Sequence, residues 1–421
     1  METINHAPDS TDISFFDRPQ VRIEKIPVGR GVPFGLERVS NPEIGIGGVY
    51  GAWGECYSNE TLSSLIEERL GEPLSREDKL NLSELGFKYR HHLQTLSQQE
   101  HIQLEVEVGS RLLSEAAHAN GWEPAEVEAV LVGTTNPVTE DYTEQIAAKA
   151  GIPSGAMKVS IHKACDGSVG GLHLALNPGL AINQHLSQNL AEYLYGKKIL
   201  VGGIEGLSRV MNFSRDKNAL QLFGNGAGII GLIPGQSMKF LVGRTLEVYD
   251  EDGVLEVHMS YPHSRRRGED SSLIEVTQTG EHHIRIAGMM HEPDGEVPVL
   301  MAGPMGMVKL FVRNGVDVVR DVYQAYQKRM AELEVPGKSI AVAIVHHANL
   351  KINKLKEKHL QREGIRLSMP WVLSDFGNVS AASNMIAFLR ELPYLHPHDH
   401  ILVDGFGAGT YYDALAVELG G

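Results

Sequence analysis

The chain has 421 residues, of which 42% are hydrophobic and 22% charged, a composition that is typical of a globular protein with a large core and excludes a disordered chain. Lys and Arg number 38 against 53 Asp and Glu, and the net charge of -15 argues against a nucleic acid as the main partner. With two cysteines, no signal-peptide pattern in the first residues and no apolar run near the ~18 residues of a membrane span, we expect a cytoplasmic protein that does not cross a membrane.

The regular pattern of the chain starts near residue 47, so we assign residues 1–46 to an N-terminal extension. In chain order, the spacing of apolar residues predicts a helix over 105–122, a buried strand over 127–135, a strand over 157–162, a helix that ends near 176, a helix over 317–337, a buried strand over 339–349 and a helix over 350–365. Alternating helices and strands indicate an α/β protein with parallel strands, whose functional groups lie at the carboxyl ends of the strands.

Two stretches of the chain can be laid over each other. Residues 127–152 and 340–365 each contain an apolar strand, a polar turn with an asparagine, and a helix that closes on Gly-Ile. A helix after a strand is common, but the correspondence of several elements favours an internal duplication. We therefore divide the remainder into an N-terminal half, 47–235, and a C-terminal half, 236–421.

Cys165 lies where the predicted strand 157–162 gives way to a turn and a helix. A helix N-terminus favours negative charge, so this position predicts a nucleophilic thiol with a lowered pKa. A lone cysteine is more often a buried structural residue, and the neighbouring motifs must decide.

Three further segments follow predicted strands and complete a set of groups for acyl chemistry. They are "VHHAN" at 345–349, "DFGNVSAAS" at 375–383 and "VDGFGAG" at 403–409. A cysteine can hold an acyl group as a thioester, while histidine and asparagine N–H groups can stabilise negative charge on a carbonyl oxygen. Glycines beside Phe406 allow the backbone to approach a ligand closely.

Taken together, "SNETL", "ELGFKYR", "TTNP", "ACDGSVGG", "LFGNGAG", "HHANLKI", "GNVSAAS" and "GFGAG" resemble, in order, the motifs of the thiolase superfamily and its β-ketoacyl-acyl-carrier-protein synthase III branch. The resemblance covers about residue 58 to the end. It implies the thiolase fold, with duplicated βαβαβαββ halves in five layers (αβαβα). It also implies that Cys165 is the acyl-accepting nucleophile and that His346 and Asn378 act on the second substrate.

The resemblance assigns further roles. The oxyanion hole would be the backbone N–H groups of Cys165 and Ala408. His346 rather than His347 matches the family's His-x-Ala-Asn motif, and on a strand only one of the two can face Cys165. The remaining candidates for substrate or carrier binding are Asn349, Lys351, Phe406 and Gly407. Asn349 is either a turn residue or one that orders water or His346.

The sequence departs from the family pattern where coenzyme A is usually gripped. Family members carry a Trp and an Arg there, and this chain has Leu80 and Glu84. Coenzyme A priming of the usual kind is therefore doubtful, whereas a phosphopantetheine arm on an acyl carrier protein fits. The lysines at 351, 354, 356 and 358 are either a solvated helix face or a dock for an acidic carrier, and Ser264–Gly268 is a second candidate dock.

Glu140 lies in the loop that, in the family, reaches across a homodimer toward the partner's cysteine. Related head-to-head condensing enzymes place a glutamate base there, so Glu140 is a candidate base. Without that role it is an ordinary acidic residue near a helix start.

Two other types of site are not expected. The spacing of Gly226, Gly228 and Gly231 matches a dinucleotide fingerprint, but the surrounding residues are typical of a strand. His162 and Cys165 lack a second Cys/His pair for zinc, since Cys56 stands alone. We expect no metal and no tightly bound cofactor.

The leading hypothesis is a ketosynthase of specialised metabolism. It catalyses a Claisen-type condensation of an acyl thioester held on Cys165 with a malonyl or β-ketoacyl thioester, and a ring closure can follow. Three alternatives stay open: an acyltransferase to a non-carbon nucleophile, a hydroxymethylglutaryl-CoA-synthase-like condensation, and a non-catalytic ketosynthase partner subunit. Substrates arrive on phosphopantetheine or coenzyme A, and the resemblance implies a homodimer.

Overall fold

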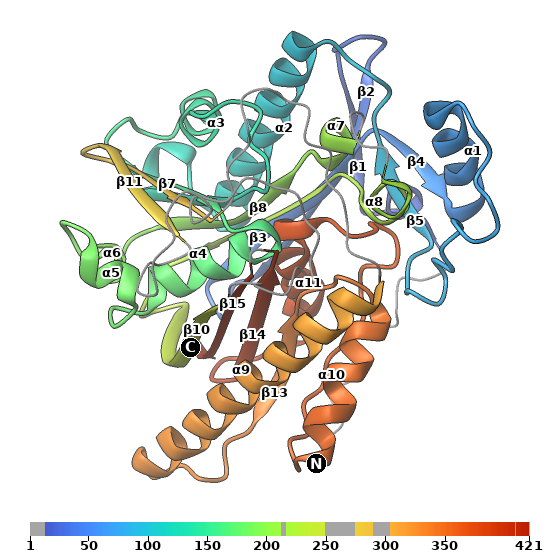
Figure 1. Ribbon diagram of the computed structural model, residues 1–421. Helices are drawn as coiled ribbons and strands as arrows, with labels where there is room; N and C mark the ends of the chain where they lie inside the picture. The colour runs from blue at the N-terminus through green and yellow to red at the C-terminus, as the bar shows by residue number, and fades with distance from the viewer. Residues whose placement is uncertain (1–12, 212–215, 249–273, 289–303, 409, 421) are drawn as a thin grey trace.

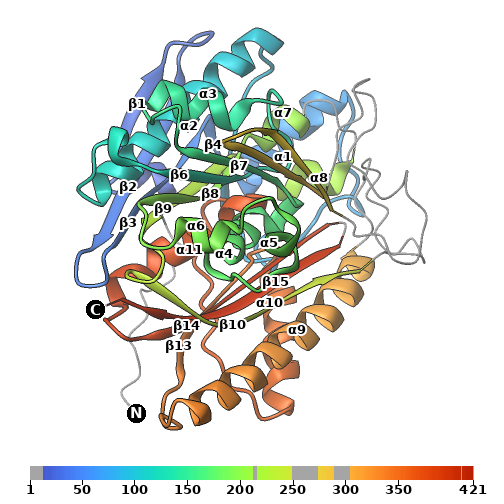
Figure 2. The ribbon, with the colours of Figure 1, turned by 90° about the vertical axis from the view of Figure 1, so that its left-hand side faces the viewer.

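The computed structural model describes residues 13–211, 216–248, 274–288, 304–408 and 410–420, which stack in five layers (Figures 1 and 2). Helices α2 (Gln98–Ala119) and α3 (Tyr142–Ala150) cover the outer face of a large sheet. Helices α4 (Gly167–Leu176) and α11 (Ser383–Glu391) lie between this sheet and a smaller one, and α9 (Pro304–Glu332) with α10 (Leu350–Arg362) forms the last layer. The expected αβαβα order is confirmed.

The large sheet has nine strands in the order β1-β2-β3-β9-β8-β6-β7-β12-β11. Their bounds are β1 Arg22–Ile26, β2 Val32–Asn41, β3 Ile46–Trp53, β6 Ala129–Gly133, β7 Met157–His162, β8 Ile199–Glu205, β9 Gly226–Leu232, β11 Glu275–Gly280 and β12 His283–Ala287. Strands β8, β6, β7 and β12 run parallel to one another, so their carboxyl ends meet at one edge of the sheet.

The smaller sheet has four strands in the order β10-β15-β14-β13. Their bounds are β10 Met238–Glu247, β13 Ile340–Val345, β14 His400–Gly407 and β15 Tyr411–Leu419. The order and the directions of these strands repeat those of β3-β9-β8-β6, with two antiparallel pairs followed by a parallel pair. The two sheets are therefore copies of one arrangement, as the duplicated sequence predicts.

Both ends of the large sheet carry strands beyond the repeated set. Strands β1 and β2 come from the segment expected as an extension, and β2 pairs along β3 from Phe34 to Asn41. At the opposite end, β12 pairs in parallel with the outer edge of β7, placing Ile286 beside Ile161. The β11–β12 hairpin comes from the C-terminal half of the chain, so it covers an edge of the N-terminal half.

The remaining described elements lie around these layers. They are the paired strands β4 (Glu55–Ser58) and β5 (Tyr89–His92), the helices α1 (Asn59–Leu70), α5 (Ala181–His185), α6 (Leu190–Leu194), α7 (Leu207–Met211) and α8 (Lys217–Leu222), and short 3-10 turns. Side chains of Ser58 and Ser97 cap α1 and α2, each in a reciprocal capping box that satisfies free N–H groups of the first turn.

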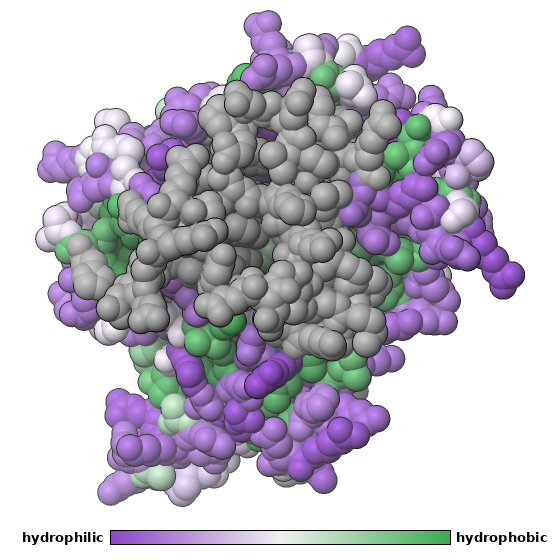
Figure 3. Space-filling model, in the orientation of Figure 1, coloured by the Kyte–Doolittle hydropathy of each residue, from purple (hydrophilic) through white to green (hydrophobic). Residues whose placement is uncertain are grey.

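The surface of the outer helices is mainly hydrophilic. In the space-filling view, purple residues dominate the lower part of the molecule, where α9 and α10 lie, and green residues form smaller areas between them (Figure 3). Among the described helices, none has both the length and the apolar character needed to cross a lipid bilayer.

One lysine of α10 is not on the surface. Lys351, Lys354 and Lys358 are exposed, but Lys356 is fully buried and forms an ion pair with Asp404 of β14. Its ammonium group also lies 4.8 Å from the centre of the Phe406 ring. The expectation that all four lysines share a solvated or docking face is therefore wrong for Lys356, because helical geometry turns this residue toward the sheet.

We predict that Lys356→Met lowers the free energy of unfolding by about 3–5 kcal/mol, because it leaves the Asp404 carboxylate buried without its partner. Burial raises the pKa of Asp404, so acidification should reduce this loss as the carboxyl group takes up a proton. Urea unfolding at several pH values measures both effects. The control is Lys354→Met on the exposed side of the helix, expected to change stability by less than about 0.5 kcal/mol. Equal effects of the two substitutions would contradict the prediction.

Candidate active site

Cys165 lies in a tight turn between β7 and α4. The turn is a 3-10 segment, Ala164–Asp166, and Ala164 has a left-handed φ of 49°. The second half of the chain repeats this geometry, since the segment Ser380–Ala382 leads into α11 and Ser380 has a φ of 44°. Such backbone costs about 1–3 kcal/mol for a non-glycine residue and is typical of functional sites. The two strained turns pack against each other in the middle layer.

Hydroxyl groups connect the Cys165 sulfur to a buried carboxylate. The Ser380 Oγ donates to Cys165 Sγ at 3.2 Å and lies 2.7 Å from Thr135 Oγ1. Thr135 in turn donates to Glu205 Oε1 from its hydroxyl, at 2.6 Å, and from its backbone N–H, at 2.9 Å. The same oxygen accepts the backbone N–H of Ala381 at 3.2 Å. This chain of contacts joins the ends of β6 and β8 to the two central turns.

Burial controls the acidity of these groups. It is the main cause that raises the pKa of Cys165 to about 12, against the hydrogen bond from Ser380, which lowers it. The lowered thiol pKa expected from the helix N-terminus is therefore wrong, because desolvation outweighs the helix dipole here. Burial also raises the pKa of Glu205 to about 7.

An ion cluster fixes the turn that carries Cys165. Lys163 Nζ lies 2.7 Å from Asp166 Oδ2 and also contacts Asp413 of β15, and all three side chains are buried. Asp413 is bonded in addition to His173 Nδ1 at 2.5 Å. The cluster ties the residues on both sides of Cys165 to the smaller sheet.

His346 follows β13 and is fully buried. Its Nδ1 lies 2.5 Å from Ser383 Oγ, and its Nε2 has no hydrogen-bond partner among the described residues. Burial, with the neighbouring charges of His347 and Lys356, lowers its pKa well below the usual value, so the ring is neutral at pH 7. His346 thus presents one ring nitrogen for a ligand.

His347 has no such free nitrogen. Its Nδ1 is bonded to the Val345 carbonyl at 2.8 Å, and its Nε2 accepts the Val372 N–H at 3.2 Å. The ring packs against Trp371, with centroids 4.6 Å apart. His347 therefore has the role of a satisfied packing residue.

Asn378 is held close to the same turn. Its Oδ1 accepts the Ser380 N–H at 2.9 Å, and its own backbone N–H donates to the Leu222 carbonyl at 2.9 Å. The Nδ2 group makes a long contact, 3.5 Å, with the Ala348 carbonyl just after His346 and His347. With its oxygen engaged, the side chain directs its N–H donors toward the end of β13.

The end of β14 touches the backbone of Cys165. A Cβ atom at Gly407 would lie 2.3 Å from the Lys163 carbonyl and 3.1 Å from the Cys165 nitrogen, so only glycine fits. This approach brings the adjacent Ala408 near the cysteine. Phe406 is buried, and the rings of Phe406 and His346 are nearly perpendicular, with centroids 4.8 Å apart. This packing helps to fix the position of the histidine ring.

Comparison with known proteins finds similar condensing enzymes. Residues 330–419 match the family model of the 3-oxoacyl-[acyl-carrier-protein (ACP)] synthase III C-terminal region. The chain is 24% identical over 323 residues to the β-ketoacyl-[acyl-carrier-protein] synthase III of Clostridium tetani, covering 74% of this chain and 83% of that one. The C-terminal region of the chain therefore matches the synthase III family model, and the chain as a whole is similar to β-ketoacyl synthases III.

Solved structures of β-ketoacyl synthase III-like proteins share its fold. The 3-oxoacyl-(acyl carrier protein) synthase III of Pseudomonas aeruginosa PAO1 superposes with a TM-score of 0.59 at 18% identity, covering 87% of this chain and 95% of that one. The priming β-ketosynthase of the R1128 polyketide pathway superposes with a TM-score of 0.56 at 21% identity, covering 90% of this chain and 95% of that one. The thiolase fold expected from the sequence is confirmed.

Two residues assigned to the mouth of this synthase-like site have local contacts. Asn349 caps α10, since its Oδ1 accepts the Ile352 N–H at 2.9 Å, as in the simple turn interpretation. Lys351 is exposed and forms an ion pair of 2.6 Å with Glu84. Glu84 therefore partly neutralises the charge of Lys351.

Glu140 lies at the surface, beside strand β12. Its side chain is 93% exposed and lies 3.7 Å from Arg285 of β12. It borders a pocket of about 290 Å³. The lining residues are Thr135, Asn136, Pro137, Val138, Thr139, Glu140, His162, Glu275, Thr277, Arg285 and Ala287. Thr135 and Glu140 of one chain therefore share a pocket.

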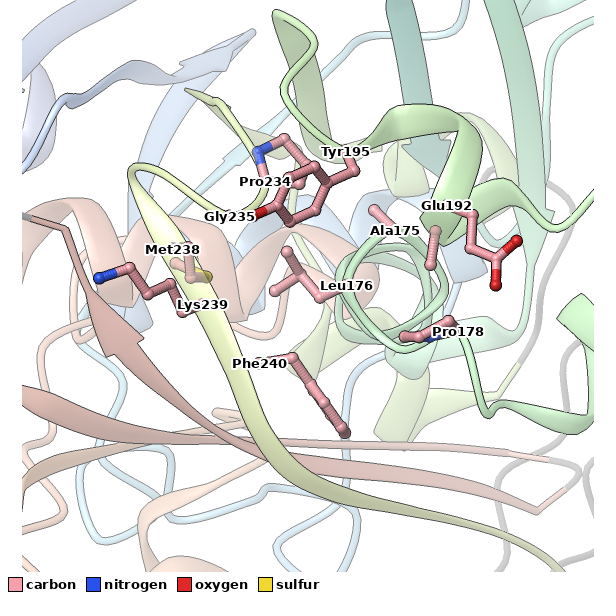
Figure 4. Close-up of a pocket in the computed structure, with 11 residues that line it drawn as sticks. Ala175, Leu176, Pro178, Glu192, Tyr195, Pro234, Gly235, Met238, Lys239 and Phe240 are labelled. Atoms are coloured by element: carbon pink, nitrogen blue, oxygen red, sulfur yellow. The ribbon is translucent and has the colours of Figure 1, made fainter. Parts of the chain in front are cut away.

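A larger pocket, of about 650 Å³, lies at the other end of α4 (Figure 4). It is bordered by Leu176 at the end of that helix, by Tyr195 and by Phe240 of β10, and Cys165 is not among its residues. Cys165 lies in the turn before α4 and Leu176 ends the helix, so the length of α4, about 14 Å along its axis, lies between them. This pocket is separate from the acyl site.

The other candidate sites have structural explanations. Gly226 and Gly228 belong to strand β9, as expected, and a side chain at Gly228 would meet the backbone of α11 at 2.7 Å. Cys56 lies in β4, with its sulfur 2.9 Å from Ser14 Oγ. Within the described ranges, no group of three or more metal-ligating side chains comes together. The basic segment Ser264–Gly268 lies outside the described residues.

The sequence interpretation missed Thr135, Glu205 and Ser380. Two of them lie inside motifs that were recognised, "TTNP" and "GNVSAAS", and Glu205 ends strand β8. The available signal was position, because a carboxylate at the carboxyl end of a buried parallel strand lies at the functional edge of such a sheet.

Proposed function

We propose that the protein is a ketosynthase that condenses an acyl thioester, held on Cys165, with a malonyl or β-ketoacyl thioester. The observation that carries this proposal is the meeting of three groups at the two central turns. The Ser380 hydroxyl donates to Cys165 Sγ, and the Ser380 backbone N–H donates to Asn378 Oδ1. His346 Nδ1 is hydrogen-bonded to the hydroxyl of Ser383, three residues after Ser380. The proteins that the chain resembles include β-ketoacyl-[acyl-carrier-protein] synthases III and a priming β-ketosynthase of a polyketide pathway, which supports the proposal.

In the first half-reaction, the Cys165 thiolate attacks the carbonyl carbon of the donor thioester. A new C–S bond forms, the old one breaks, and the carrier thiol leaves with a proton. The backbone N–H groups of Cys165 and Ala408 are the proposed donors to the oxyanion, and the tight contact at Gly407 holds these two segments together.

In the second half-reaction, an enolate formed from the second thioester attacks the acyl group on Cys165 and releases the thiolate. We assign His346 Nε2 and Asn378 Nδ2 as donors to the oxygen of that thioester. A hydroxyl of Ser383 that donates to Nδ1 leaves the proton of the neutral ring on Nε2, where it can be donated. The neutral histidine suits this role because it stabilises charge without adding a buried cation.

We propose that the substrates come on a phosphopantetheine arm, with no cofactor held by the protein itself. Lys351, beside Glu84, is the candidate contact for an acidic carrier protein. The Trp and Arg that the resemblance leads us to expect for binding coenzyme A are absent from this chain. A location in the cytoplasm stays a prediction.

Cys165→Ala should abolish acyl loading, because the nucleophile is removed. Intact-mass spectrometry after incubation with acyl-carrier and acyl-CoA donors measures the adduct directly. Cys56→Ala is the matched control and should load normally, since this thiol lies in another part of the fold. An adduct on Cys56 with Cys165 unlabelled would refute the assignment of the nucleophile, and the lack of any adduct would favour a non-catalytic subunit.

His346→Ala and Asn378→Ala should separate the two half-reactions. Both variants should still load Cys165 but lose condensation by ~10²-fold or more, because each removes a donor to the developing oxyanion. The acyl adduct is measured by mass and the condensed product by chromatography. His347→Ala is the control, with both ring nitrogens already bonded to the backbone. Normal condensation in His346→Ala with loss in His347→Ala would show that the other histidine acts.

The homodimer implied by the resemblance stays a proposal, with one structural restriction. Strand β12 already pairs with the outer edge of β7, so a second copy cannot pair with that edge of β7 in this arrangement. The pocket that holds Glu140 also holds Thr135 of the same chain. We therefore propose that Glu140 serves as a base in its own chain, rather than across a dimer.

Glu140→Gln should lower condensation by at least ~10²-fold if the carboxylate is a base. Mixing Glu140→Gln subunits with Cys165→Ala subunits should then restore no activity, because neither chain holds both groups. Turnover of each variant and of the mixture gives the comparison. Recovery in the mixture would place Glu140 in the partner's site, and full activity of Glu140→Gln alone would remove the base.

A further inference from the structure

The mechanism leaves one proton unassigned. Cys165 must lose its proton before it can attack, yet burial opposes the charged sulfur. His346 is a poor acceptor, because burial and the nearby Lys356 hold its pKa well below the usual value. Another buried group must receive the proton.

The hydroxyl chain leads from the sulfur to Glu205. The three steps are 3.2 Å from Cys165 Sγ to Ser380 Oγ, 2.7 Å from there to Thr135 Oγ1, and 2.6 Å from Thr135 Oγ1 to Glu205 Oε1. Each distance is that of a hydrogen bond. The Ser380 hydroxyl donates to Cys165 Sγ, which is the arrangement that a transferred proton leaves behind, and its oxygen lies within reach of the Thr135 hydroxyl. Glu205 and Ser380 are almost fully buried, whereas Thr135 and Cys165 are partly exposed.

We propose that Glu205 receives the proton of the Cys165 thiol through the hydroxyls of Ser380 and Thr135. This inference rests on the proposed function for its role in turnover. The thiol proton passes to Ser380, the Ser380 proton to Thr135, and the Thr135 proton to Glu205. Each O–H bond that breaks is replaced, and the products are a thiolate and a carboxylic acid.

The same path runs backward when the donor thioester is cleaved. The Cys165 thiolate forms the new C–S bond, and the departing carrier thiolate needs a proton. Glu205 can return the one it holds, through Thr135 and Ser380, so that it ends the half-reaction as a carboxylate. Proton and charge then balance without an outside acid or base.

The energetics favour a single shared charge. An ionised Glu205 disfavours an ionised Cys165, because two negative charges in one buried site repel. Transfer along the chain moves the existing charge instead of adding a second one. The pKa of Glu205, raised to about 7 by burial, leaves it largely ionised just above neutral pH and able to accept. Glu205 acts through two hydroxyls and so is a positioning residue for the proton, not a group that touches substrate.

The test is the pH dependence of Cys165 alkylation by iodoacetamide, followed by mass spectrometry on the peptide that contains Cys165. While the pH is below the pKa of an isolated thiol, its alkylation rate rises about tenfold for each unit by which the pH increases. In the proposed pair, Cys165 and Glu205 hold one proton between them once the pH exceeds the pKa of Glu205. The fraction of Cys165 that is a thiolate then no longer changes with pH. The wild-type rate should therefore rise up to about pH 7 and then level off.

Glu205→Gln and Ser380→Ala should both replace the plateau by a steady rise of about tenfold per pH unit. The first removes the carboxylate that holds the proton, and the second breaks the hydrogen-bonded chain that couples this carboxylate to the sulfur. Ser160→Ala is the matched control. This substitution removes a different buried hydrogen bond, of 2.8 Å, between the hydroxyls of Ser160 and Thr143. Ser160 lies on β7, the strand that leads into the cysteine turn. The variant should keep the plateau. Urea unfolding of each variant confirms that it is folded, and Ser380→Ala carries the test if Glu205→Gln is not.

A wild-type profile without a plateau, or a plateau that persists in Glu205→Gln, would overturn the proposal. A plateau that is lost in His346→Ala and kept in Glu205→Gln would assign the proton to the histidine. Alkylation needs no thioester, so these outcomes do not depend on the identity of the acyl substrate. A failure of the proposed function appears separately, as the lack of acyl loading on Cys165.

Discussion

The contact between the two strained turns is the constraint on which the rest of the site depends. Ala164 and Ser380 both have left-handed backbone, and the segments that contain them meet between the sheets. The approach is so close that a side chain at Gly167, which follows the first turn, would lie 3.2 Å from the Ala381 Cβ. Tight packing of this kind leaves few alternative positions for the attached side chains. Ser380 therefore reaches Cys165 from the opposite half of the chain.

This burial sets the chemistry of every group around the sulfur. Removing water raises the pKa of the thiol and of Glu205 and lowers that of His346. All three shifts favour the neutral form, as desolvation requires. A site of this type can hold a thioester away from hydrolysis, but it must move its protons internally. Hydroxyl groups of Ser380 and Thr135 provide polar atoms for that purpose without adding charge.

The sequence predicted the layers, the duplication and the positions of Cys165, His346 and Asn378, because apolar periodicity and ordered motifs report directly on strands and on the residues after them. The β11–β12 hairpin was not predicted, since its mixture of charged and apolar residues does not say which edge it will join. Lys356 was placed on the surface because lysine spacing alone does not show which side faces Asp404. Glu205 was not predicted because its hydrogen-bond partners, Thr135 and Ala381, lie 70 and 176 positions away in the sequence.

The duplication also explains why each chain has one such site rather than two. The backbone of the two turns is the same, with a left-handed residue followed by a helix, yet the side chains differ. In the first half the left-handed residue is Ala164 and the next is Cys165. In the second half the left-handed residue is Ser380, and Ala381 takes the place of the cysteine. Because the turns face each other, the serine of one half lies beside the thiol of the other, and the asymmetry that makes catalysis one-sided comes from the side chains alone.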